Sequence, residues 1–206
     1  MKKLLSFCLM LVLSVSVMAM SACFGGGTEK TEFQKMFDVV SENCTIRATG
    51  VYSEYYIYKY TEDKIQVVEP TSGGALGTKW WDATDTSDYV LLERSADTLF
   101  NLRVTHKDKW HYTSARKDTF SLLFGCFAEH EDEFTKTPEG NYKSTLGDPI
   151  VHTHDGVEYQ YDDITIFVEE GKIVSAEYTI YISGMPMGYE LQAGNTTIIL
   201  PEYQRN

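Results

Sequence analysis

The stretch ITIFVEEGKIVSAEYTIYI, residues 164–182, decides the fold. Apolar residues alternate with other residues in both of its halves, at Ile164, Ile166 and Val168 and then at Val174, Ala176, Tyr178 and Ile180. A period of two places alternate side chains on opposite faces of a β-strand. Residues 169–172 separate the halves and include the turn-forming Gly171. The stretch therefore predicts an antiparallel hairpin with one buried face.

The same pattern, in which turn-forming residues separate alternating segments, recurs along the chain outside this hairpin. Alternating segments, such as the long strand predicted at 51–58, are separated by turn-forming pairs and triplets. These are Glu62-Asp63, Ser72-Gly73-Gly74, Lys107-Asp108, Pro138 to Asn141, Asp155-Gly156 and Gly194-Asn195. Regular turns between strands predict an antiparallel meander.

Two segments have helical rather than strand periodicity. Residues 32–42 place Phe33, Met36, Phe37 and Val40 on one helical face, and residues 118–131 do the same with Phe120, Leu123, Phe124 and Phe127. Each apolar face must be buried against another layer. We therefore predict an α+β, mainly β domain in which two short helices pack on the concave face of a curved antiparallel sheet.

The N-terminal residues resemble an export signal. Residues 1–22 combine Lys2 and Lys3 with an apolar run and small residues at the end, as signal peptides do. Met20-Ser21-Ala22-Cys23 resembles the lipobox of bacterial lipoproteins, with Met20 where that motif usually has Leu. The resemblance implies a signal peptide at 1–22, a palmitate-type lipid on Cys23, a flexible tether over 23–31 and a single domain over 32–206. It also implies a cell-membrane location on the extracytoplasmic face.

The charge of the mature chain excludes some partners. Without residues 1–22, the 18 basic residues become 16 and the 30 acidic residues remain, so the net charge is −14. Such a chain repels phosphates unless its basic residues cluster, and they do not. We therefore expect no nucleic-acid partner, and attachment to the membrane through the N-terminal lipid alone.

The order of the predicted elements resembles a known family. A lipidated cysteine, a helix feeding a strand at Asn43 to Ile46, a meander with a central helix and a closing strand at Gly194 to Pro201 are similar to the LolA/LppX-like half-barrel lipoproteins of Gram-positive bacteria. The resemblance implies an open half-barrel with an apolar pocket between sheet and helices, able to hold a lipid or another apolar small molecule. Its lining here would be Phe33, Phe37, Phe120, Phe124, Phe127 and Trp80.

Trp80 and Trp81 are adjacent in a predicted strand and therefore face opposite ways, so at most one indole joins the core face. The other indole would line a ligand mouth or pack under a loop. Cys44 and Cys126 remain in the mature chain, and two alternatives stay open for them. They form a disulfide, as an exported protein allows, or they are two buried free thiols.

The residues point to no enzyme, cofactor or metal site. There is no Gly-x-Ser-x-Gly nucleophile motif and no phosphate-binding loop. His152 and His154 share one strand face and would bind zinc only with a third ligand such as His111 or Glu158 nearby, so solvated histidines at a strand end are favoured. Two functions remain: binding of an apolar ligand, or a non-catalytic interaction with another envelope protein through an acidic, tyrosine-rich face.

Overall fold

The computed structural model describes residues 29–49, 55–70, 76–84, 88–94, 102–108, 119–145, 147–182 and 184–203. The chain divides into two units, Met1–Thr31 and Glu32–Asn206, and the second is described below. The predicted signal peptide and Cys23 lie outside the described residues, as do His111 and residues 51–54 of the predicted long strand. Among the described helices, none is long and apolar enough to cross a membrane.

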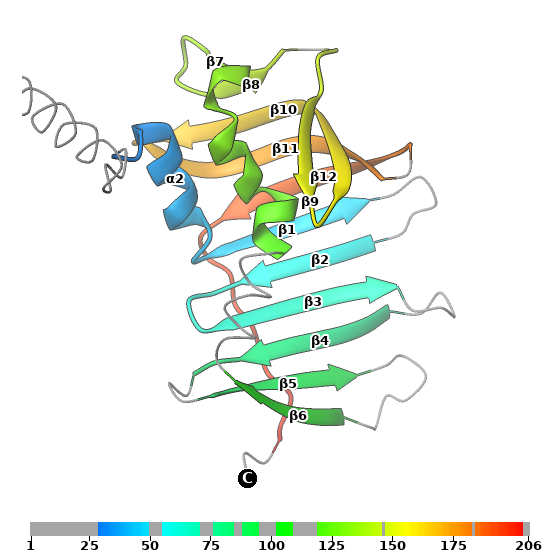
Figure 1. Ribbon diagram of the computed structural model, residues 1–206. Helices are drawn as coiled ribbons and strands as arrows, with labels where there is room; N and C mark the ends of the chain where they lie inside the picture. The colour runs from blue at the N-terminus through cyan, green and yellow to red at the C-terminus, as the bar shows by residue number, and fades with distance from the viewer. Residues whose placement is uncertain are drawn as a thin grey trace, which may run out of the picture. The chain divides into compact units, whose positions relative to one another are not determined.

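Twelve strands within the described residues form one antiparallel sheet (Figure 1). The sheet order is β6-β5-β4-β3-β2-β1-β12-β11-β10-β8-β7, and β9 pairs with β10 off this path. β1 pairs with β12, so a meander from the first half of the chain joins one from the second half at the centre. The strands are β1 (Cys44–Thr49), β2 (Tyr55–Tyr60), β3 (Lys64–Pro70), β4 (Leu76–Asp82), β5 (Asp88–Arg94), β6 (Leu102–Asp108), β7 (Phe134–Lys136), β8 (Tyr142–Ser144), β9 (Ile150–His154), β10 (Val157–Glu169), β11 (Lys172–Ile182) and β12 (Met185–Ala193).

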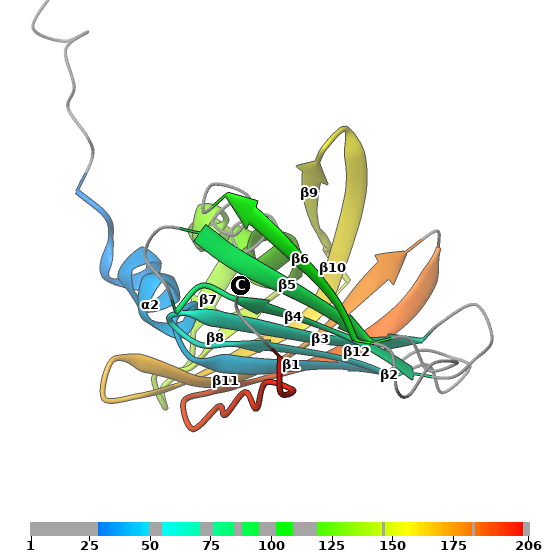
Figure 2. The same ribbon diagram turned by 90° about the horizontal axis from the view of Figure 1, so that it is seen from below.

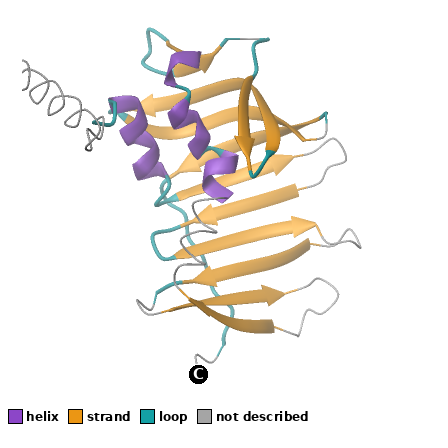
Figure 3. Ribbon diagram, in the orientation of Figure 1, coloured by secondary structure: helices purple, strands orange, loops and turns teal. Residues whose placement is uncertain are grey.

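The sheet is curved and unclosed, and the helices lie on its concave face (Figures 2 and 3). α2 spans Glu32–Val40, close to the predicted 32–42, and buries all four residues of its predicted apolar face. The predicted α+β, mainly β half-barrel with two short helices is confirmed.

The second predicted helix is broken rather than continuous. Residues 119–123 are α-helical, and 3-10 turns η2 (Gly125–Glu129) and η3 (Glu131–Glu133) follow. Asp118, the first residue of the predicted helix, lies outside the described residues. A Cβ at Gly125 would lie 3.0 Å from the Phe120 ring, so a larger residue here would force that ring to shift by a few tenths of an ångström.

The hairpin predicted at residues 164–182 is present and is formed by β10 and β11. Glu170 and Gly171 both have positive φ, at 50° and 74°, as a type I′ turn requires. Ala176, Tyr178 and Ile180 are buried as predicted. Val174 is not, because a register irregularity after Phe167 places Ile173 inward in its stead.

The predicted closing strand at Gly194 to Pro201 is wrong. Residues 195–203, the outer-face segment, form no strand and run across the sheet on the side opposite the helices (Figure 2). β12 already pairs with β1 and β11, so no edge is left beside it, and Asn195 turns the chain outward with a φ of 53°. The Thr196 amide donates to Asn43 Oδ1 at 3.0 Å, and Tyr203 donates its hydroxyl to Asp82.

Candidate functional site

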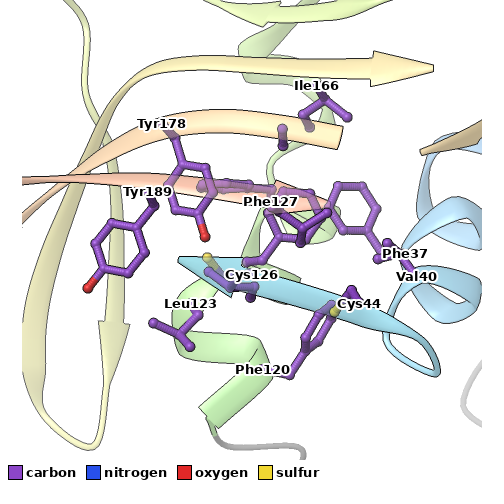
Figure 4. Close-up of a cluster of buried hydrophobic side chains, with 14 of the residues drawn as sticks. Phe37, Val40, Cys44, Phe120, Leu123, Cys126, Phe127, Ile166, Tyr178 and Tyr189 are labelled. Atoms are coloured by element: carbon purple, nitrogen blue, oxygen red, sulfur yellow. The ribbon is translucent and has the colours of Figure 1, made fainter. Parts of the chain in front are cut away.

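The five phenylalanines predicted to line a pocket are packed together in the core on the concave face. Figure 4 shows three of them, Phe37, Phe120 and Phe127. α2 supplies Phe33 and Phe37, and residues 119–129 supply the other three. Each is at most 7% exposed. The Phe124 ring centroid lies 5.1 Å from that of Phe37, 6.1 Å from Phe120 and 5.4 Å from Phe127. These five residues, the phenylalanine plug, occupy the space beneath the helices with their own rings.

Trp80 does not belong with these residues, and its inclusion in the pocket lining is wrong. It packs on the opposite face of the sheet with Val90 and Leu92, under Ile198, Leu200 and Tyr203 of the outer-face segment. Trp81 is the indole on the concave face, where it packs against the main core. The parity of the strand predicted that the two indoles would separate, but it could not say which of them faces the helices.

A partly exposed aromatic surface lies beside the plug on the same concave face. Tyr56 and Tyr58 of β2, Trp81 of β4 and Leu91 of β5 form this concave strip, and all four are half-buried against the core. Strand pairing places these residues on one face. Trp81 pairs directly with Leu91. Tyr58 pairs with Val67 of β3, whose partner Lys79 lies two residues before Trp81 on β4 and therefore on the same face. The sequence signal for this strip was the run of tyrosines after residue 51.

Hydroxyl groups and one ion pair give the concave strip a polar edge. Tyr189 of β12 lies in the same row as Tyr56, with only Ala48 of β1 between them. Burial raises the pKa of Tyr189 to about 12 and raises that of Tyr58 further, so both hydroxyls stay protonated at neutral pH and can donate. Glu69 and Lys79 form an ion pair on this face.

The Tyr178 hydroxyl lies inside the core. Its ring stacks on Tyr189 at 5.3 Å, and its hydroxyl points toward Cys126 (Figure 4). This oxygen is buried and has no hydrogen-bond partner among the described residues, whereas the nearby Tyr161 hydroxyl donates to the Leu122 carbonyl oxygen at 2.6 Å. Burial raises the pKa of Tyr178 well above its ordinary value.

Cys44 and Cys126 are both buried free thiols. Of the two alternatives that the sequence allowed, the structure has the second, and the suggested disulfide is not formed. Burial raises the pKa of Cys126 to about 12, which keeps this thiol protonated and unreactive.

Two hollows lie among the described residues, away from the plug. One of about 560 Å³ is a polar depression on the outer face, with Gly188 among its lining residues and Arg47, Asp163, Glu177 and Glu190 around it. The other, of about 240 Å³, is an apolar groove between α2 and the hairpin end, lined by residues such as Val39 and Ile173. The first is within the size range of small-molecule sites and the second is below it.

Histidines gather at one place that the sequence indicated only in part. His152 and His154 share a face of β9 as predicted, with ring centroids 6.4 Å apart. The ring beside them is that of His130, after η2, at 6.0 Å from His152. Among the described residues, no group of three or more His, Cys, Asp or Glu side chains is arranged to hold a metal ion.

Comparison of the sequence with protein-family models and with curated proteins finds no match.

Proposed function

We propose that this chain is an extracytoplasmic lipoprotein, anchored through lipid on Cys23, that binds an apolar ligand or lipid against the concave strip. The observation that carries the proposal is the half-buried aromatic surface of Tyr56, Tyr58, Trp81 and Leu91 beside the helices. Side chains of this kind combine a large apolar area with a polar tip and suit contact with an amphipathic molecule.

The phenylalanine plug changes where such a ligand would bind. The rings beneath the helices already contact one another, so a ligand there would have to displace them at several kcal/mol each, as in large core cavities. The concave strip needs no such displacement. We therefore place the ligand beside the plug.

The tether also limits the role. From Cys23 to Thr31 it spans about eight residues, which extend to no more than roughly 28 Å. A protein tethered so closely would bind its ligand at the membrane surface and would not carry it far.

Native mass spectrometry of the protein extracted from membranes in a mild detergent, combined with titration of a fluorescent fatty acid, tests this function. We expect a co-purified apolar mass and saturable binding. Tyr58→Ala and Trp81→Ala should each weaken binding about tenfold, the effect of losing roughly 1.4 kcal/mol of contact. Val104→Ala, on the edge strand β6, is the control that should bind normally. No bound mass together with no saturable binding would refute the proposal.

The plug also favours the second candidate, a non-catalytic interaction module with a solid core. In that case the acidic surface, with a net charge of −14, and the tyrosines would contact another envelope protein. Photocrosslinking in cells from position 58, with position 199 as the control, distinguishes the two. A single protein captured only from position 58 would favour the module, and recovery of lipid alone would favour the ligand-binding function.

A further inference from the structure

The β9–β10 hairpin stands away from the rest of the sheet on the side of the helices (Figure 2). Its base is fixed in the core. Ile150 and Tyr161 are buried opposite each other, and the Tyr161 ring lies 5.2 Å from Phe127 in an edge-on contact. The base is therefore held by apolar packing and by the bond from Tyr161 to the Leu122 carbonyl.

The outer half of the hairpin is held differently. One step further along the same face, His152 pairs with Tyr159, and the His152 ring meets the His130 ring at 6.0 Å and 81°. His154 follows on that face and stacks beside His152 at 6.4 Å. The contact between the hairpin and the end of η2 is thus made by imidazole rings, with His152 between His130 and His154.

The charged groups around His152 come from three elements. The end of η2 brings Glu129 and His130, β9 brings His154, and β10 brings Tyr159. Asp155 lies 3.8 Å from His154 but its carboxylate is 94% exposed, so water screens it. Burial, with the neighbouring His130 and His154, lowers the pKa of His152, and the Glu129 carboxylate opposes this only in part.

We propose that the packing of His152 between His130 and His154 is an acid-sensitive latch, which holds the β9–β10 hairpin against η2 while His152 is neutral and releases the outer half of the hairpin when His152 is protonated. Because the pKa of His152 is lower in the folded state than its ordinary 6.5, the contact is fully stable above pH 6.5 and weakens as the pH falls below that value. Release would expose Tyr159 and the end of η2 while the hairpin base stays packed. This inference goes beyond the proposed function and does not depend on it.

Hydrogen exchange measured by mass spectrometry at about pH 5 and about pH 7.5, corrected for the intrinsic exchange rate, tests the latch. In the full chain, we expect protection of residues 151–159 to fall about tenfold at the lower pH, while β1 and β12 keep theirs. His152→Phe retains an aromatic ring against His130 without a titrating group and should remove most of that pH dependence.

His106→Phe is the matched control, because His106 is an exposed histidine on β6, outside the cluster. This variant should show the same pH dependence of hairpin protection as the unaltered chain. His130→Gln provides a second test in case His152→Phe fails to fold. Equal protection of the hairpin at both pH values, or unchanged pH dependence in the folded His152 or His130 variant, would overturn the latch.

Discussion

At the residue scale, Phe124 shows why residues with the pattern of a ligand pocket became a core. Its side chain is fully buried and contacts rings from α2, from its own segment and from β11. Helical periodicity identified it as an inward-facing residue. Periodicity cannot say whether the residues opposite leave room for a ligand, because that depends on side chains more than 50 residues away, such as Phe37 and Tyr178.

Replacing Phe124 by Ala should lower the free energy of unfolding by about 3–5 kcal/mol, because it removes a buried ring and leaves a cavity. Urea unfolding measures this. Val39→Ala is the control, since Val39 is 57% exposed on α2 and should change stability by less than about 0.5 kcal/mol. Similar losses in the two variants would mean that the plug is not the tightly packed core described.

Tyr178 and Tyr161 together test how much a buried hydroxyl contributes to the free energy of unfolding, with and without a hydrogen-bond partner. Tyr161→Phe removes the bond to Leu122 and leaves a carbonyl unpaired, so it should cost about 1–2 kcal/mol. Tyr178→Phe removes a buried hydroxyl that has no partner and should be neutral or stabilising by about 1 kcal/mol. Thermal unfolding of both variants is the measurement, and the reverse order would contradict the contacts assigned here.

The Cys126 thiol should be inert in the folded protein. With its pKa raised to about 12 by burial, it stays protonated at about pH 8, where an ordinary thiol is partly ionised. Alkylation followed by mass spectrometry should label neither Cys126 nor Cys44 before denaturation and both after it. Failure to label them even after denaturation without a reducing agent would indicate a disulfide.

At the element scale, the outer-face segment acts as a cover for one end of the sheet. It is held to β1 and its preceding loop at Thr196 and to β4 at Tyr203, and between these points its apolar side chains pack on Trp80, Val90 and Leu92. Exposed and half-buried side chains alternate from Thr197 to Leu200. Such alternation fits a segment lying on a sheet as well as a strand within one. Only the pairing of β12 on both sides excluded the strand.

Neighbouring residues of this segment provide a direct test of the cover. Leu200→Ala should destabilise the protein by about 1–2 kcal/mol and shift Trp fluorescence to longer wavelength, because Leu200 packs on the Trp80 cluster. Ile199→Ala should change stability by less than about 0.5 kcal/mol, since Ile199 is 80% exposed. Equal effects at the two positions would argue against packing of the segment on the sheet.

At the scale of the whole molecule, the proposed lipid anchor and the acidic domain have separate tests. Cys23→Ser should abolish incorporation of labelled palmitate and move the protein from the membrane fraction to the medium or the soluble envelope fraction. The domain should still fold, since Cys23 lies outside the unit Glu32–Asn206. Fractionation and circular dichroism check both statements, and membrane retention of the unlipidated variant would refute anchoring through Cys23.

The sequence by itself determined the fold class, because strand and helix periods, turn residues such as Glu170-Gly171 and the apolar face of α2 are local properties. It also determined which residues of each strand or helix share a face. The tertiary structure alone decided which of Trp80 and Trp81 faces the helices, that the phenylalanines contact one another, and that His130 joins His152. Those outcomes depend on sheet order and on the crossing of the outer-face segment, both of which arise from contacts between residues distant in the chain.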